Sequence, residues 1–112
     1  MDNCPDGCIR CKKRATAADG EGFKSGEAYD LCICVHAEQN AILSAAKLGI
    51  SVNNATLYTT MTPCFGCAKE LLQAGIRKVY YHDEWTHPRI NDDADLRDQY
   101  KRLLGELHCQ KV

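Results

Sequence analysis

Two short motifs in this sequence carry residue types that bind metals and move protons. The first, His-x-Glu, places His36 two residues before Glu38; the second, Pro-Cys-x-x-Cys, places Cys64 three residues before Cys67. A catalytic zinc ion takes three protein ligands and keeps one position for water. His36, Cys64 and Cys67 supply that number, so we predict that they bind one zinc ion.

Glu38 is predicted to carry protons rather than to bind the metal. Zinc acidifies a coordinated water toward neutral pH, and a carboxylate within hydrogen-bond reach can accept the proton and later donate it to a leaving group. Residues two apart do not share a face in mid-helix. This role therefore requires His36 and Glu38 to lie at the first turn of a helix. The expected chemistry is acid–base hydrolysis.

Each motif alone also has an ordinary interpretation. A His-x-Glu pair is common at the start of a helix, and a Cys-x-x-Cys pair can be a redox couple or part of a structural zinc site. Together, on two predicted helices separated by one strand and with Pro63 before the first cysteine, the motifs are far more specific.

The elements that position these motifs follow from the pattern of apolar residues. Apolar residues recur at helical spacing over residues 36–48 and stop before a glycine, which indicates a helix. The β-branched and aromatic run at 55–60 follows the turn-like pair Asn53 and Asn54 and indicates a strand. Pro63 suits the first turn of a second helix, which carries Cys67 and ends near Gly75. Each motif is therefore expected at the start of a helix.

The rest of the chain continues the alternation of strands and helices. Residues 77–82 indicate a second strand, and residues 91–107 begin with capping Asn and Asp and place apolar residues on one face of a final helix. A short strand is expected at 107–111. This order is typical of a parallel sheet with right-handed crossovers, so the fold class is α/β.

The length of the chain favours one domain. A chain of 112 residues can bury a modest core without staples. Residues 1–34 are rich in cysteine and glycine and show no helical or strand period, which indicates a cysteine-rich insert. Residues 35–112 then form the zinc-binding catalytic core.

Composition and charge exclude several classes of partner. The 14 basic and 15 acidic residues give a formal net charge of −1, so a broad nucleic-acid-binding surface is not expected. No stretch is apolar for the roughly eighteen residues of a membrane span, and the N-terminus lacks a secretory signal. These features predict a cytoplasmic protein, where the eight cysteines serve as thiolates rather than disulfides.

The cysteines ahead of His36 predict a second metal site. Four thiolates can close a tetrahedral structural zinc site, and such a site would order a segment without a core of its own. Spacing does not show which four of the five bind, and free thiols are the alternative. The candidates are Cys4, Cys8, Cys11, Cys32 and Cys34.

The residues around the two motifs resemble a known family. His-x-Glu followed by Pro-Cys-x-x-Cys is the signature of the zinc nucleobase deaminases. Within that superfamily, HAEQNAI at 36–42 and ATLYTTMTPCFGCAKELLQAGIRKVYY at 55–81 resemble the deoxycytidylate (dCMP) deaminases. NCPDGCIRC and LCICVHAE resemble the cysteine-rich insert of some members. Cytidine deaminases usually have Cys where His36 stands, and the tRNA adenosine deaminases match the flanking residues less well.

This resemblance implies a cytidine-deaminase-like αβα sandwich and the hydrolytic deamination of dCMP to dUMP and ammonia, a step of pyrimidine deoxynucleotide metabolism. The enzyme would be a hydrolase that acts on the C–N bond of a cyclic amidine. Carried over by position, the resemblance makes His36, Cys64 and Cys67 the zinc ligands. Glu38 would move protons to N3 and to the amino group while C4 of the cytosine ring is attacked.

The resemblance also implies contacts with the substrate. The backbone near Ala37 and the segment from Thr60 to Pro63 would flank the base. An aromatic residue follows the second strand in this family, and Trp85 occupies that place. Stacking or sugar contact by Trp85 and an ordinary core position are equally consistent with the sequence.

Family members normally begin with a helix and two strands ahead of the cysteine-rich insert, and this chain starts after that point. We therefore expect a sandwich truncated at the N-terminus, with two of the usual five strands missing. Relatives commonly form homo-oligomers and respond to deoxynucleoside triphosphates, so the resemblance implies both properties here.

Two alternatives remain open from the sequence. The chain could deaminate a base in single-stranded DNA or RNA, although its near-neutral charge argues against that substrate. It could also be a catalytically weak, zinc-stabilised remnant of the family.

Overall fold

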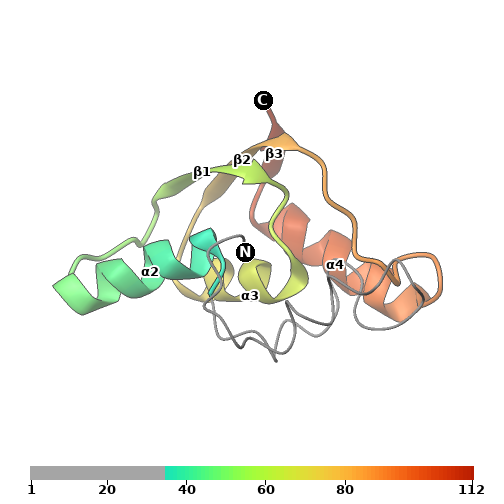
Figure 1. Ribbon diagram of the computed structural model, residues 1–112, viewed down its shortest axis with the longest axis horizontal. Helices are drawn as coiled ribbons and strands as arrows, with labels where there is room; N and C mark the ends of the chain where they lie inside the picture. Colours follow the sequence, from blue (N-terminus) through green and yellow to red (C-terminus); the bar gives the residue numbers. More distant parts are fainter. Residues whose placement is uncertain (1–34) are drawn as a thin grey trace, which may run out of the picture. The chain divides into compact units, whose positions relative to one another are not determined.

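The computed structural model describes residues 35–112, which alternate between helices and strands (Figure 1). In chain order the elements are α2 (Ala37–Leu48), β1 (Thr56–Met61), α3 (Phe65–Gln73), β2 (Lys78–Asp83), α4 (Ala94–Glu106) and β3 (Cys109–Lys111). Every helix and strand expected in this part of the chain is present. The candidate ligands of a second zinc, from Cys4 to Cys34, lie outside the described residues.

The three described strands form one parallel sheet in the order β1-β2-β3. Helix α3 connects β1 to β2, and α4 connects β2 to β3, so both connections are helical crossovers. Parallel neighbours need such crossovers because a tight hairpin cannot join them. The predicted α/β class with a parallel sheet is confirmed.

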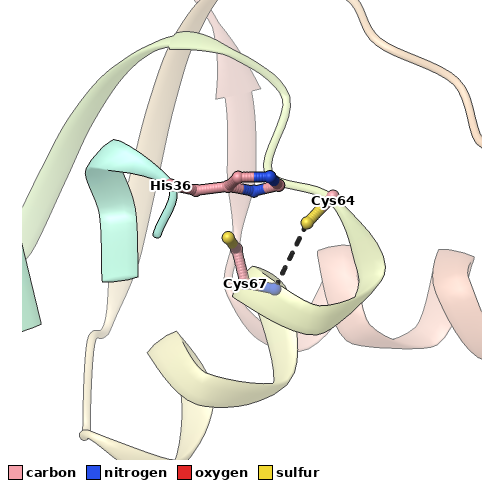
Figure 2. A group of neighbouring side chains, drawn as sticks. All are labelled: His36, Cys64 and Cys67. Atoms are coloured by element: carbon pink, nitrogen blue, oxygen red, sulfur yellow. Dashed lines mark hydrogen bonds between the residues drawn. The ribbon is translucent and has the colours of Figure 1, made fainter. Parts of the chain in front are cut away.

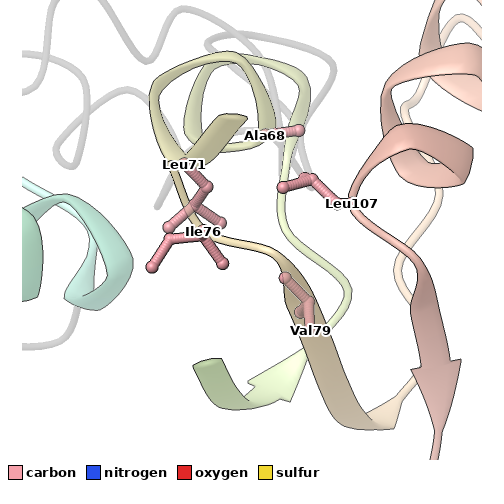
Figure 3. Packing of buried hydrophobic residues seen from close by; sticks show 5 residues of the cluster. All are labelled: Ala68, Leu71, Ile76, Val79 and Leu107. Atoms are coloured by element: carbon pink, nitrogen blue, oxygen red, sulfur yellow. The ribbon is translucent and has the colours of Figure 1, made fainter. Parts of the chain in front are cut away.

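The core lies between one face of this sheet and the helices. Leu57, Val79 and Cys109 are paired in register across the three strands and point toward that side. The fully buried side chains packed there come from α3, the strand β2 and the residues next to α3 and α4 (Figure 3). They are Ala68, Leu71, Ile76, Val79 and Leu107. Burial of these apolar side chains is the main stabilising term for the described fold.

The opposite face of the sheet is polar and open among the described residues. Tyr58 is 74% exposed, and its ring stacks on Tyr80 with 5.2 Å between centroids. Thr56, Lys78 and Gln110 belong to the same face by strand alternation. Within residues 35–112 the helices thus cover one face, and a second helical layer of the expected sandwich is not found in that part of the chain.

Helix α2 packs more loosely than its apolar sequence suggested. Ile42 contacts the core, but α2 has no fully buried residue. Leu48, at the end of α2, is 72% exposed. The apolar period of α2 therefore does not correspond to a fully packed face among the described residues.

A tight contact between two turns aligns β1 with the end of α3. Gly75 has φ of +90° and Asn54 has φ of +64°, which matches the helix stop and turn read from the sequence. The Asn54 N–H donates to the Gly75 carbonyl at 2.7 Å. A Cβ atom on Gly75 would meet the Asn53 side chain and lie 3.1 Å from the Asn53 Cα, and the positive φ also favours glycine there.

Candidate metal centre

The predicted metal ligands come together in the structure. One ligand atom each from His36, Cys64 and Cys67 lies within 4.8 Å of the others. Figure 2 shows the imidazole and the two sulfur atoms directed toward one another from the starts of two helices. No other group of three or more candidate ligands occurs within residues 35–112. The arrangement matches the spacing argument made from the sequence.

The start of α2 places the His-x-Glu motif as its chemistry requires. His36 directly precedes the helix, and Glu38 is the second residue of its first turn. Both side chains are half-buried. At a helix start two residues can point into one pocket, so the condition set for Glu38 as a proton carrier is met.

The start of α3 places the two cysteines, with one correction. Pro63 does not lie in the first turn, because Cys64 is the N-cap, in extended conformation, and the helix begins at Phe65. The Cys64 sulfur accepts a hydrogen bond from the Cys67 backbone N–H at 3.5 Å. A side chain that caps the helix from outside needs extended backbone at its own position, so the helix begins after the proline.

The loop before Cys64 is held from two elements. Tyr100 of α4 is buried, and its hydroxyl donates to the Pro63 carbonyl at 2.5 Å. The Thr62 N–H donates to the Asp83 carbonyl at 3.0 Å, and the Thr62 hydroxyl accepts from the Trp85 N–H at 3.2 Å. No site role was predicted for Tyr100, and Thr62 was expected only as part of the segment from Thr60 to Pro63 that flanks the base. The available signal for Tyr100 was a phenol hydroxyl on an otherwise apolar helix face.

The carboxylate of Glu38 is held by β1. The Thr59 hydroxyl donates to Glu38 Oε1 at 2.6 Å. Thr59 was not among the predicted site residues, and nothing in its local sequence distinguishes it from its threonine neighbours.

The electrostatics of the group favour a bound cation. The side-chain hydrogen bond with Cys64 and burial raise the pKa of Cys67 far above the ordinary cysteine value, and the negative charges of Cys64 and Glu38 act in the same direction. A divalent cation offsets this repulsion and binds the deprotonated thiols. Two thiols and an imidazole are the donor types that suit zinc, so the residues present fit that metal.

The three residues predicted to contact substrate differ in how exposed they are. Ala37 is exposed beside His36, and Thr60 is exposed near the end of β1. Because strand side chains alternate, the Thr60 side chain points away from the face where Thr59 meets Glu38. Trp85 is half-buried, and its ring meets Tyr100 edge-on at 6.1 Å between centroids. The roles of Ala37, Thr60 and Trp85 stay predictions.

Cys109 lies apart from the metal group. It packs against the core from β3, and burial raises its pKa to about 11. Among the described residues no helix has the length and apolar character needed to cross a membrane.

Comparison with known families gives one clear match. The family described as "Cytidine and deoxycytidylate deaminase zinc-binding region" matches residues 2–83, which include both motifs.

Individual relatives agree with this match. A deoxycytidylate deaminase of Schizosaccharomyces pombe is 37% identical over 85 residues, which cover 75% of this chain and 24% of the relative. A deoxycytidylate deaminase of Enterobacteria phage T4 is 44% identical over 85 residues, 70% of this chain and 44% of the relative. This chain thus corresponds to less than half the length of either relative.

A solved structure has a similar fold. It is a dCMP deaminase from the cyanophage S-TIM5 in complex with dCMP and dUMP, with a TM-score of 0.50 and 33% sequence identity. The match covers 81% of this chain and 65% of the phage enzyme.

Proposed function

The chain belongs to the cytidine and deoxycytidylate deaminase zinc-binding family, and from this we propose that it catalyses the hydrolytic deamination of dCMP to dUMP and ammonia. One observation carries the proposal: His36, Cys64 and Cys67 converge within 4.8 Å at two helix starts, next to the helix turn that presents Glu38. The deoxycytidylate deaminases among its relatives, and the phage enzyme in complex with dCMP and dUMP, support the choice of substrate.

We assign the zinc ligands to His36, Cys64 and Cys67. When bound there, zinc supplies a positive charge that lowers the pKa of a coordinated water toward neutrality. The Cys67 backbone N–H donates to the Cys64 sulfur at the start of α3, which favours the thiolate form of Cys64. Half-burial of His36 and full burial of Cys67 limit competition from bulk water.

We assign the proton transfers to Glu38. The reaction adds water across C4 and N3 of the cytosine ring and then breaks the bond from C4 to the amino nitrogen. Glu38 accepts the proton of the attacking water and donates it to N3. Glu38 then takes the remaining proton of that water from the hydroxyl on C4 and donates it to the amino group. The amino group leaves as ammonia, and the Glu38 carboxylate is regenerated. A positioned acid–base group of this kind contributes roughly 10²–10⁴-fold to rate.

The base would lie beside the metal group, flanked by the backbone at Ala37 and by the segment that follows Thr60. The exposed position of Ala37 supports this proposal. Trp85 would border the nucleotide, because its ring packs on Tyr100 next to the loop that carries Cys64.

Further proposals concern the rest of the protein. Residues 1–34 would form a cysteine-rich insert with a second, structural zinc held by four of its five cysteines, and residues 35–112 would form the catalytic core. The enzyme would be a cytoplasmic homo-oligomer, since its thiol ligands need a reducing compartment. Deoxynucleoside triphosphates would act as effectors.

The test is an ultraviolet assay of dCMP turnover with the zinc-loaded chain, run beside deoxycytidine and a cytosine-containing oligonucleotide. We expect turnover of dCMP, and a loss of roughly 10²-fold or more in Glu38→Gln with the zinc content unchanged. Glu106→Gln is the matched control, because Glu106 is exposed in α4 and pairs only with Arg102 among the contacts described. If the chain deaminates the oligonucleotide but not dCMP, its substrate is a polynucleotide and not the free nucleotide. No turnover of any substrate by a zinc-loaded chain would refute the enzymatic proposal.

Metal content tests the ligand assignment separately. Cys67→Ser should lose the zinc of this site, whereas Cys109→Ser should keep it, because Cys109 lies in β3 outside the metal group. Equal zinc content in both variants, measured by elemental analysis per chain, would rule out the assigned ligands.

A further inference from the structure

A short hydrogen bond joins the proposed proton carrier to the sheet. The Thr59 hydroxyl donates to Oε1 of Glu38 at 2.6 Å, across 21 residues of sequence. This length is typical of a hydroxyl that donates to a charged carboxylate, which is roughly twice as strong as a bond between neutral groups. This hydrogen bond therefore restrains the position of the Glu38 carboxylate.

Thr59 is a rigid donor. It lies within β1 and is paired in register with Tyr81 of β2, so its backbone is held by the parallel ladder. Its β-branched side chain has few χ1 rotamers. Glu38, by contrast, has three rotatable side-chain bonds and lies in the first turn of α2, a helix without a fully buried residue. The strand therefore holds the carboxylate more firmly than α2 does.

We propose that Thr59 is a positioning residue that orients the Glu38 carboxylate for proton transfer. The bond engages Oε1, so Oε2 is the oxygen assigned to exchange protons with substrate. This inference rests on the proposed deaminase function and extends it. In this role Thr59 acts through Glu38.

A purely structural role for the same bond predicts different behaviour. In that case the hydroxyl would connect α2 to β1, and its loss would lower the stability of the chain while turnover per folded molecule stayed the same. A positioning role predicts a lower kcat with little change in KM, since removal of a group that acts only in the transition state affects kcat and kcat/KM equally.

The experiment compares Thr59→Val, which keeps the side-chain shape, with Thr59→Ser, which keeps the hydroxyl. We expect Thr59→Val to lower kcat roughly 10–100-fold, because a catalytic group displaced by about 1 Å loses activity on that scale. KM for dCMP and zinc content should stay near the wild-type values. Thr59→Ser should recover most of the activity. Thr56→Val, an exposed threonine of the same strand, should match wild type.

Crystal structures of the zinc-loaded wild type and Thr59→Val give a readout that does not depend on activity. We expect one position of the Glu38 carboxylate in the wild type and several rotamers in the variant. An unchanged carboxylate position in Thr59→Val, or an unchanged kcat, would overturn the positioning role. A wild type that binds zinc and shows the bond but turns over no dCMP would refute the proposed function alone, and the rotamer comparison would still decide the positioning role.

Discussion

Tyr100→Phe tests how the metal loop is supported. The substitution removes one oxygen atom and keeps the ring, which packs against Phe65 and Trp85 with centroids 6.1 Å from each. What it deletes is the hydrogen bond from the phenol to the Pro63 carbonyl. Pro63 directly precedes Cys64, a proposed zinc ligand, so the change probes the proposed metal site through the backbone alone.

The magnitude follows from burial at both ends of the bond. Tyr100 is 4% exposed and Pro63 is fully buried, so the carbonyl is left without this donor and is shielded from water. A buried acceptor left without a partner costs about 1–3 kcal/mol. For a domain of this size, each kcal/mol corresponds to roughly 4–8 °C in Tm. Loss of a residue that supports a metal ligand also typically lowers the metal affinity by about 10–100-fold.

The assay measures zinc affinity by competition with a chelator and the Tm of the metal-free chain. Tyr58→Phe is the matched control, because the Tyr58 ring is exposed on the open face of the sheet and should change neither quantity. A lower Tm with unchanged zinc affinity would show that the bond stabilises the fold without positioning Cys64. If both the zinc affinity and the Tm were unchanged, the reasoning would be refuted, because loss of the hydrogen bond to the buried carbonyl would then not destabilise the chain.

Two other predictions concern the backbone and the alkaline stability of the chain. Gly75→Ala should lower the free energy of unfolding by roughly 1–3 kcal/mol in urea, because φ is +90° and the new Cβ meets Asn53. Gly105→Ala is the control and should be neutral or stabilising, because Gly105 lies in α4 with open space around it. Equal effects of the two substitutions would contradict the turn geometry. Burial raises the pKa of Cys109 from 9.0 to about 11, so its contribution is full below pH 9 and is lost as pH rises to about 11. Cys109→Ala should therefore show a shallower loss of stability than wild type over that range, and parallel curves would contradict the shift.

The secondary elements and the convergence of the three candidate metal ligands were predictable because their signals are local. Cysteines three residues apart at a helix start, and a glycine with positive φ at a helix end, are recognisable within a few residues of sequence. The asparagine turn before β1 and the Asp93 cap of α4 belong to the same kind, and Asp93 accepts from the Leu96 N–H at 3.0 Å. Backbone requirements of this kind leave few residue types that fit.

The start of α3 and the packing of α2 were not predictable to the same degree. Whether Pro63 or Cys64 caps the helix depends on where the chain leaves β1, and that is set by the pairing of β1 with β2. Likewise, the apolar period of α2 does not show how much of the stripe finds a surface to pack on, which left Leu48 exposed.

The sequence alone was enough to propose the donor set and the proton carrier, since the identity and spacing of His36, Glu38, Cys64 and Cys67 restrict the chemistry whatever the fold. Tertiary structure decided which residues hold them in place. Thr59 meets Glu38 across 21 residues and Tyr100 meets Pro63 across 37. Such contacts depend on strand register and helix packing, which arise from the whole core and leave no local pattern in the chain.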